Sequence, residues 1–260
     1  MNIAVILAGG IGRRFGSPIP KQFVNVLGKP IIAYTVEHFE NHPCIDAILV
    51  VCVRSYIDYM WELKNTYKFS KLKWIVEGGD SFQNSVMNGV DYLYDKIDAN
   101  DIVLVHFGAS PFVTQEIITD ALKVCKDNGT NAISSTDFYL LSGKKKYLIS
   151  TSDKKNYTDE YIDRNSIAIM NTPHAFRYKF IVDLYDEAKQ TGVINTVEPH
   201  TTTLMYALGK PIYFSKGSQS NIKITNAEDI ELFEGYALAR QIRNRNQKVE
   251  DALNKLNIID

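Results

Sequence analysis

Short apolar runs alternate with longer amphipathic segments along most of this chain, and this alternation constrains its fold more than any other feature. The apolar runs are nearly continuous and rich in β-branched residues, as expected for strands covered on both faces. They predict strands at 2–8, 46–53, 72–77, 101–106, 131–135 and 211–215. The amphipathic segments predict helices at 30–41, 55–68, 81–96, 115–128, 177–190 and 226–247.

Regular strand–helix alternation predicts an α/β fold, with a Rossmann-like, mostly parallel sheet flanked by helices on both sides. Ligands of such sheets bind at the carboxyl ends of the strands. The first predicted strand runs directly into the glycines of AVILAGGIGRRFGSPIPKQF, residues 4–23, so this turn lies at the ligand-binding edge. Three cations follow the glycines: Arg13, Arg14 and Lys21.

The chain as a whole is close to neutral, so an anion has to be recognised locally. A formal net charge of -1 over 260 residues provides no basic field for nucleic acid. The three cysteines, Cys44, Cys52 and Cys125, lack CxxC spacing, which favours a reducing cytosol. No apolar run reaches the roughly 20 residues of a membrane span, and the first residues do not resemble a signal peptide. We therefore expect one cytoplasmic α/β domain, residues 1–260, that binds neither nucleic acid nor membrane.

Residues 138–165 interrupt the strand–helix rhythm with a polar stretch that holds two short apolar patches. Structureless loops longer than about 12–15 residues are uncommon in compact domains. A projecting β-hairpin arm is therefore expected here at least as much as a long surface loop.

The last part of the chain, 237–260, is expected to be a helical tail. A capping box, Thr225-x-x-Glu228, with Asp229 in the first turn, marks where the last helix begins. Further along, near-heptad spacing relates four apolar residues, which we attribute to core or tail packing rather than to a partner helix: Ile242, Val249, Leu253 and Leu256.

Three types of phosphate-binding turn can be compared with the glycine run. A Walker A loop needs a lysine after its last glycine, and none follows Gly16. A dinucleotide fingerprint needs a third small residue, where this chain has Phe15. A nucleotidyltransferase loop fits better, because glycines let the backbone approach a triphosphate and cations neutralise the charge that grows as pyrophosphate leaves. Pro18 and Pro20 stiffen the segment that presents Lys21. An ordinary strand-to-helix turn with solvated cations is the alternative.

The motif LAGGIGRRFG…PKQF followed by GKPII resembles the cytidylyltransferases that make CDP-alditols, such as ribitol-5-phosphate and 2-C-methylerythritol 4-phosphate cytidylyltransferase. The resemblance runs from residue 3 to about 236 and recurs in EGGDSFQNSVMNG, VLVHFGASPF, DRNSIAIMNTPHAF and SNIKITNAEDIELFE. It implies a nucleotidyltransferase (GT-A-like) fold. It also implies that a substrate phosphate attacks the α-phosphorus of CTP and expels pyrophosphate.

The resemblance assigns the catalytic positions to three cations, Arg14, Lys21 and Lys223, which would bind the triphosphate and stabilise the transition state. Lys223 also precedes a predicted helix N-terminus, where anions are favoured. The nucleotide-binding positions would be Leu7, Ala8, Gly9, Gly10, Gly12, Gly79, Asp80, Ser85 and His106. Two of these assignments have plainer alternatives. EGGDS is also a plausible strand-to-helix turn with an N-cap, and His106 ends a buried strand, where a structural role is expected before that of a general base.

On the acceptor and metal side, the chain departs from the family pattern. Phe107 stands in place of a metal-associated aspartate, Ser110 and Phe82 in place of arginines, and Phe138 in place of a threonine. The acceptor-binding positions implied by the resemblance are Arg164, Ser110, His200 and Thr201, and no metal ligand is assigned. Mg²⁺ would then be carried largely by CTP, because this ion relies on substrate phosphates and water. In the family, the arm that carries Arg164 crosses into a neighbouring subunit, which implies a homodimer through 138–165.

The sequence therefore predicts a cytidylyltransferase that joins CTP to a small phosphorylated polyol. A CTP-binding relative with little turnover and a dinucleotide-dependent oxidoreductase are the rival hypotheses. His38 and His42 have the i, i+4 spacing of metal ligands, but no third ligand accompanies them in the sequence.

Overall fold

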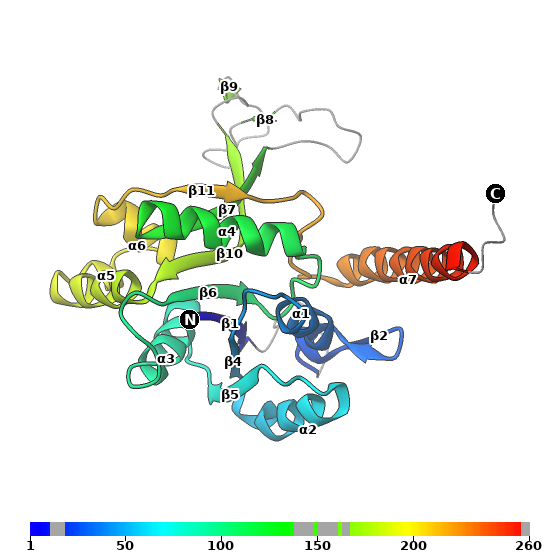
Figure 1. The fold of residues 1–260 in the computed structure, drawn as a ribbon. Coiled ribbons are helices and arrows are strands. Elements are labelled where there is room, and N and C mark those ends of the chain that lie inside the picture. Colours follow the sequence, from blue (N-terminus) through cyan, green and yellow to red (C-terminus); the bar gives the residue numbers. More distant parts are fainter. Residues whose placement is uncertain (11–18, 138–147, 150–160, 163–166, 256–260) are drawn as a thin grey trace.

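A seven-stranded sheet forms the centre of the protein in the computed structural model, which describes residues 1–10, 19–137, 148–149, 161–162 and 167–255 (Figure 1). The strands lie in the order β11-β7-β10-β6-β1-β4-β5. Their bounds are β1 Asn2–Ala8, β4 Ala47–Cys52, β5 Leu72–Glu77, β6 Ile102–Phe107, β7 Asn131–Asp137, β10 Ala168–Arg177 and β11 Phe214–Lys216. The six strands expected from the apolar runs are all present, although β11 begins and ends later than expected.

The sheet is mostly parallel, as expected. β1 pairs in parallel with β4 and β6, β4 with β5, and β11 with β7. β10 is antiparallel to both of its neighbours, β6 and β7. The sequence did not predict this strand, because Asn171, Pro173 and His174 interrupt its apolar pattern. Its pairing with β7 shifts register between Met170 and His174, so β10 is irregular where these polar residues lie.

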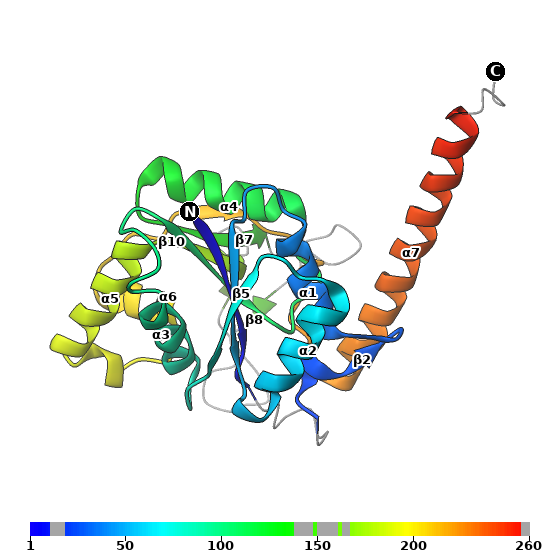
Figure 2. The ribbon, with the colours of Figure 1, turned by 60° about the horizontal axis from the view of Figure 1, so that its bottom comes forward.

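Helices cover both faces of the sheet, because successive residues of a strand point to opposite sides. Ala4, Ile6 and Ala8 of β1 pack with α1 (Ile31–Glu40), α2 (Ile57–Tyr67) and α4 (Gln115–Asn128). Ile3, Val5 and Leu7 pack with α3 (Phe82–Tyr92), α5 (Tyr178–Gln190) and α6 (Thr201–Ala207). Figure 2 shows α1 and α2 on one side of the sheet and α3 and α5 on the other.

The remaining elements are short. The described residues include short 3₁₀ turns at Lys21–Phe23 (η2), Arg54–Tyr56 (η3) and Val193–Asn195 (η6). β2 (Asn25–Val26) and β3 (Lys29–Pro30) form a hairpin before α1. Within the predicted arm, β8 (Leu148–Ile149) and β9 (Tyr161–Ile162) pair antiparallel, and the rest of 138–165, with Phe138, lies outside the described residues.

The last helix, α7 (Ala227–Lys255), packs against the body in its first part, within residues 227–240. Phe233 and Ala237 are buried together with Ile31 and Phe112, next to the end of β6. The capping box begins one residue later than expected: the side chain of Asn226 accepts from the N–H of Asp229 (2.9 Å), whose carboxylate accepts from the N–H of Asn226 (3.0 Å). Thr225 and Asn226 are both suitable N-cap residues, so spacing alone could not separate them.

The expectation of core or tail packing beyond this anchor is wrong for Ile242 and Val249, which are both 52% exposed. From residue 240 to residue 251, every side chain of α7 is exposed, and the helix extends away from the body (Figure 2). Among the described residues, no helix combines the length and apolar character that a membrane crossing requires.

Gly89 of α3 allows this helix to pack directly on the sheet, which predicts opposite effects of alanine at two helical glycines. A Cβ at Gly89 would lie 2.9 Å from Cγ2 of Val51 and 3.0 Å from Cγ1 of Val5, whereas one at Gly235 would meet nothing within 4 Å. Both substitutions gain up to about 1 kcal/mol of helix propensity. Gly235→Ala should therefore raise the free energy of unfolding, and Gly89→Ala should lower it, because overpacking costs about 1–3 kcal/mol. Urea denaturation of the two variants checks this, and equal stabilisation by both would contradict the packing.

Candidate functional site

Two glycine-containing turns meet at the carboxyl edge of the sheet, where β1 and β5 end. A Cβ at Gly9 would lie 3.1 Å from Oγ of Ser85 and 3.3 Å from Cα of Gly78, and one at Gly79 would lie 2.4 Å from Cβ of Asn84. The hydroxyl of Ser85 holds the second turn, since it accepts from the N–H of Gly79 (3.1 Å) and lies 3.3 Å from its carbonyl oxygen. A larger residue at Gly9 would force the two turns apart, and one at Gly79 would collide with the start of α3.

Gln22 holds the backbone of the first glycine turn in place by hydrogen bonds. Its buried side chain donates from Nε2 to the carbonyl oxygens of Ala8 (2.7 Å) and Gly10 (2.9 Å). Beyond it, Gly10 is exposed, and a Cβ there would meet nothing within 4 Å. The described part of the turn is therefore held at Ala8 and Gly10, with open space next to Gly10, as a phosphate-binding turn requires.

The second turn, EGGDS, leads directly into α3. The hydroxyl of Ser81 caps the helix by accepting from the N–H of Asn84 (3.0 Å), so the expected N-cap is present. Asp80 is exposed beside this cap. The N-terminus of α3 thus adjoins the glycine turns and directs its partial positive charge toward the carboxyl edge of the sheet.

The segment before α7 is pinned to the loop that follows β6. The N–H of Ile224 donates to the carbonyl oxygen of Ala109 (2.8 Å), and the hydroxyl oxygen of Thr225 lies 3.3 Å from the carbonyl oxygen of Lys223. Nζ of Lys223 lies 3.4 Å from the centre of the Phe107 ring, a cation–π contact. Lys223 therefore lies at the end of β6, close to where β1 ends, because Leu7 and Phe107 are paired in the sheet.

Lys21 belongs to the same region as the start of α7. Although burial alone would raise the pKa of Asp229, hydrogen bonds from Thr225 and Asn226 and the positive charge of Lys21 hold that pKa below its usual range. Thr225 donates to this carboxylate from its N–H (2.6 Å) and its hydroxyl (2.7 Å). Lys21 and Lys223, 202 residues apart in the chain, thus both lie near the first turn of one helix.

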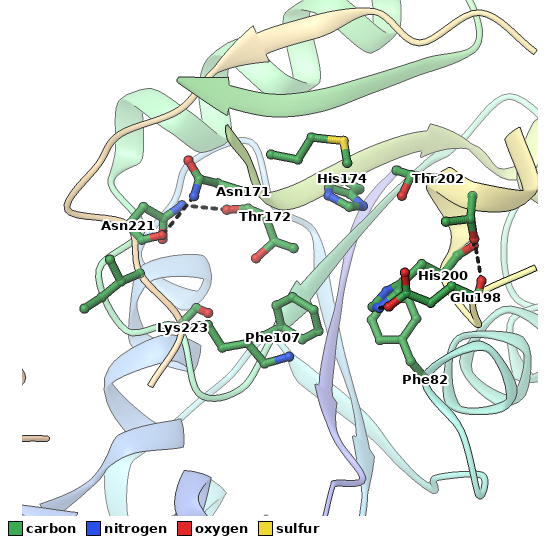
Figure 3. A pocket seen from close by; sticks show the side chains of 14 residues that line it. Phe82, Phe107, Asn171, Thr172, His174, Glu198, His200, Thr202, Asn221 and Lys223 are labelled. Atoms are coloured by element: carbon green, nitrogen blue, oxygen red, sulfur yellow. Dashed lines mark hydrogen bonds and ion pairs between the residues drawn. The ribbon is translucent and has the colours of Figure 1, made fainter. Parts of the chain in front are cut away.

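A cavity of about 470 Å³ opens beside Lys223, between β6, β10 and the start of α6 (Figure 3). Its walls are formed by side chains from these elements and from the segment before α7: Phe82, Phe107, Ser110, Met170, Asn171, Thr172, His174, Glu198, His200, Thr202, Thr203, Asn221, Ile222 and Lys223. This volume suits a small ligand.

One wall of the cavity is aromatic. The rings of Phe82 and Phe107 lie 5.4 Å apart, and those of Phe82 and His200 lie 4.8 Å apart. Phe82 and Phe107 are both departures from the family pattern noted in the sequence, and they contact each other. His200 also lies 3.6 Å from the carboxylate of Glu198, the only acidic side chain among the described residues that line the cavity.

The opposite wall is a small amide network. Nδ2 of Asn221 donates to the carbonyl oxygen of Thr172 (2.6 Å), and Nδ2 of Asn171 donates to that of Asn221 (3.3 Å). His174 lies beside them, and burial lowers its pKa to about 4, so this histidine is neutral near pH 7. Amides and hydroxyls on this wall can bind a polyhydroxylated ligand.

The structure separates the predicted site residues into three groups. Gly9, Gly10, Gly79, Asp80 and Ser85 gather at the two glycine turns, while Ser110, His200 and Lys223 line the cavity. Three predicted residues, Gly12, Arg14 and Arg164, lie outside the described residues. Leu7 and Ala8 are buried, so only their backbone is available near the turn.

Two further predicted residues are not brought to the surface of the site. Thr201 is buried, with its hydroxyl 2.8 Å from that of Tyr185, and its neighbours Thr202 and Thr203 line the cavity instead. His106 is fully buried, donates from Nε2 to the carbonyl oxygen of Ser110 (2.9 Å), and has its pKa lowered by burial to about 3. The geometry therefore supports a structural role for His106.

The described residues do not fit a metal centre held by the protein. They contain no group of three or more His, Cys, Asp or Glu side chains placed to hold an ion. Nε2 of His38 accepts instead from Arg240 (3.3 Å), and Nε2 of His42 lies 3.0 Å from the hydroxyl of Thr119. Phe107 supplies an aromatic ring at the end of β6, where a carboxylate would be needed.

Sequence reasoning missed three side chains that shape the site: Gln22, Asn171 and Asn221. Gln22 and Asn221 stand next to or near the chosen lysines, in PKQF and SNIKIT, and Asn171 lies in MNTPHAF. All three residues therefore lie in sequence segments that the family resemblance had already singled out. The pairing of Asn171 with Asn221 was not visible in the sequence, because it depends on how β10 lies against the segment before α7.

Comparison with known proteins agrees with this geometry. The sequence model of the family described as IspD, 2-C-methyl-D-erythritol 4-phosphate cytidylyltransferase, matches residues 2–239. The chain is 38% identical over 242 residues to a ribitol-5-phosphate cytidylyltransferase of Lacticaseibacillus paracasei, an alignment that covers 93% of this chain and 100% of the relative. It is 35% identical to a 2-C-methyl-D-erythritol 4-phosphate cytidylyltransferase of Clostridium acetobutylicum, with 88% and 94% covered.

A crystal structure of 4-diphosphocytidyl-2C-methyl-D-erythritol synthase from Anaerococcus prevotii has the same fold, with a TM-score of 0.73 and 22% identity over 91% of this chain and 96% of that one. This likeness confirms the nucleotidyltransferase fold that the sequence resemblance implied. With the family match over 2–239 and the relatives above 30% identity, the chain belongs to the cytidylyltransferase family of nucleotidyltransferases.

Proposed function

We propose that the chain transfers CMP from CTP to a small phosphorylated polyol, ribitol 5-phosphate or a close relative of it, and releases pyrophosphate. An oxygen of the acceptor phosphate attacks the α-phosphorus of CTP, and the bond from that phosphorus to the bridging oxygen of the β-phosphate breaks. The observation that carries the proposal is the position of Lys223. This lysine lines the 470 Å³ cavity and lies close to the glycine turns at the carboxyl edge of the sheet.

The nucleotide is assigned to the glycine-lined edge. The open space next to Gly10 suits the phosphates, and Lys21 and Lys223 supply positive charge there. The polar groups at Gly79, Asp80 and Ser85 are suited to read cytosine, because carbonyl and carboxylate acceptors select its 4-amino group. Arg14 remains assigned to the triphosphate on the family resemblance.

The acceptor is assigned to the cavity, where Ser110, His200, Asn171 and Asn221 can bind its hydroxyl groups and phosphate. Arg164 remains assigned to that phosphate on the family resemblance. The aromatic contact between Phe82 and Phe107 supports an acceptor unlike that of the methylerythritol enzymes, since the residues that differ line this cavity. The 38% identity to a ribitol-5-phosphate cytidylyltransferase points in the same direction. A CDP-alditol made in this way would serve as a building block for surface polysaccharide.

The absence of a metal-binding cluster among the described residues favours a magnesium ion that arrives on the phosphates of CTP. The same absence, together with Phe107, favours the second candidate function, a CTP-binding relative with little turnover. We retain the first because Lys21 and Lys223 are both positioned near the open glycine turn.

The assembly and cellular location are part of the same proposal. The antiparallel pair β8–β9 supports a hairpin within 138–165, which by family resemblance would join two copies as a homodimer. Cys44, Cys52 and Cys125 are all free thiols, which suits action in the cytoplasm.

Release of pyrophosphate from CTP separates the two candidate functions. With Mg²⁺ present, we expect turnover with ribitol 5-phosphate and much less with 2-C-methyl-D-erythritol 4-phosphate, because the acceptor cavity is the part that diverges. A coupled phosphate assay over a panel of alditol phosphates measures this. Binding of CTP by calorimetry without turnover on any member of the panel would establish the non-catalytic relative instead.

Removal of either positioned lysine tests the assignment of charge. Lys223→Ala and Lys21→Ala should each lower kcat/KM by on the order of 10²–10³-fold, because each removes a cation from the developing negative charge. Lys73→Ala, at the exposed amino end of β5, is the matched control and should leave turnover unchanged. Undiminished turnover in Lys223→Ala would show that the chemistry occurs elsewhere.

The role of Gln22 can be separated from general destabilisation. Gln22→Glu removes both N–H donors from the carbonyl oxygens of Ala8 and Gly10, and it should raise the Kd for CTP on the order of tenfold. Gln115→Glu removes a similar bond, to the carbonyl oxygen of His38 (2.8 Å), away from the glycine turns. Titration calorimetry with CTP compares the two variants. An equal change in both would mean that Gln22 does not act through the turn.

A further inference from the structure

The projecting part of α7 lies outside the family match and outside the body of the protein. The family model ends at residue 239, and the uninterrupted exposed stretch begins at residue 240. The last contact with the body that the structure records is the hydrogen bond from Arg240 to His38. Residues 240–255 extend for about 24 Å at roughly 1.5 Å per residue. This segment is therefore not required by the chemistry that the family shares.

The projecting segment would gain stability from a partner, because most helical stability in proteins comes from the packing of an apolar face. The side chains of 241–251 are all exposed, and no described residue of the body covers them. Ile242 and Val249, seven residues apart, lie on one side of the helix and are each 52% exposed. In sequence, Leu253 and Leu256 continue the same spacing of three and four residues. Such a stripe is typical of a coiled-coil seam.

Two polar features around the stripe identify its partner. Asn246, four residues after Ile242 and three before Val249, lies within the seam. A single asparagine at such a position favours pairing with its own counterpart in register, at a cost in stability. Arg245 and Glu250 flank the seam five residues apart, which is the offset at which parallel helices exchange ion pairs across a dimer. A second copy of this chain supplies both complements.

We propose that residues 240–255 of α7 pair with the same residues of a second copy, as a parallel two-stranded coiled coil. Ile242 and Val249 of each copy then cover one another, Asn246 pairs with Asn246, and Arg245 of each copy reaches Glu250 of the other. This interface is separate from the arm at 138–165, and it does not depend on the proposed transfer reaction. With so few turns it is weak by itself, so its strength rises with protein concentration.

Disulfide trapping tests this contact directly. In a Cys44→Ser background, which removes the exposed native thiol, Val249→Cys should form covalent dimers under mild oxidation, because the two residues face each other in a parallel pair. Asn244→Cys, on the opposite side of the helix, is the matched control. Non-reducing electrophoresis should show dimer formation by Val249→Cys at least tenfold faster than by the control. Equal rates for the two variants would overturn the proposal.

Helix content provides a second readout. It does not depend on whether the arm at 138–165 also joins two copies. Ile242→Asp/Val249→Asp should lose ellipticity at 222 nm, because the unpaired helix frays, whereas Gln241→Asp/Asn244→Asp carries the same added charge on the other side, with Arg245 and Lys248 four residues on, and should not. Pyrophosphate release should be equal in both double variants. Unchanged ellipticity in Ile242→Asp/Val249→Asp would contradict pairing along this face, and this result would leave the proposed reaction unaffected.

Discussion

Glycines let two separate turns touch at the carboxyl edge of the sheet, and the rest of the site is arranged around that contact. Gly9 and Gly78 approach so closely that a Cβ at Gly78 would lie 3.0 Å from Cα of Gly9. The hydroxyl of Ser85 holds the second turn, and Gln22 holds the first one through two backbone carbonyl oxygens. The two turns are thus fixed in position, and the space next to Gly10 remains open to a phosphate. A side chain at Gly9 or Gly78 would push the two turns apart and so disrupt the site without changing any catalytic group.

Lys21 and Lys223, which come from opposite ends of the chain, lie in the same region because α7 begins near the end of β6. The backbone bond from Ile224 to Ala109 positions Lys223, and the cap around Asp229 brings that carboxylate under the influence of Lys21. The ring face of Phe107 contacts the ammonium group of Lys223 at the end of β6. Among the described residues, no group of three or more His, Cys, Asp or Glu side chains is placed to hold an ion.

The sequence predicted those parts of the fold and site that depend on local patterns. Continuous apolar runs such as AILVVC identified the parallel strands, and glycines next to strand ends identified both turns. β10 escaped prediction because a tertiary setting buries a strand whose own residues are polar at Asn171 and His174. The cavity escaped for the same reason, since Asn171 and Asn221 meet only when the sheet is assembled. His106 followed the family pattern in sequence, yet its side chain turns into the core, which spacing alone does not reveal.

The central claim is that the open glycine turn and the two lysines surround one nucleoside triphosphate. A crystal structure with CTP and Mg²⁺ tests it most directly. The account predicts the triphosphate between the backbone of Gly9–Gly10 and Nζ of Lys223, with cytosine against Gly79 and Ser85 and the α-phosphate facing the cavity beside Phe107. CTP bound elsewhere, or with its phosphates out of reach of both Lys21 and Lys223, would contradict the account.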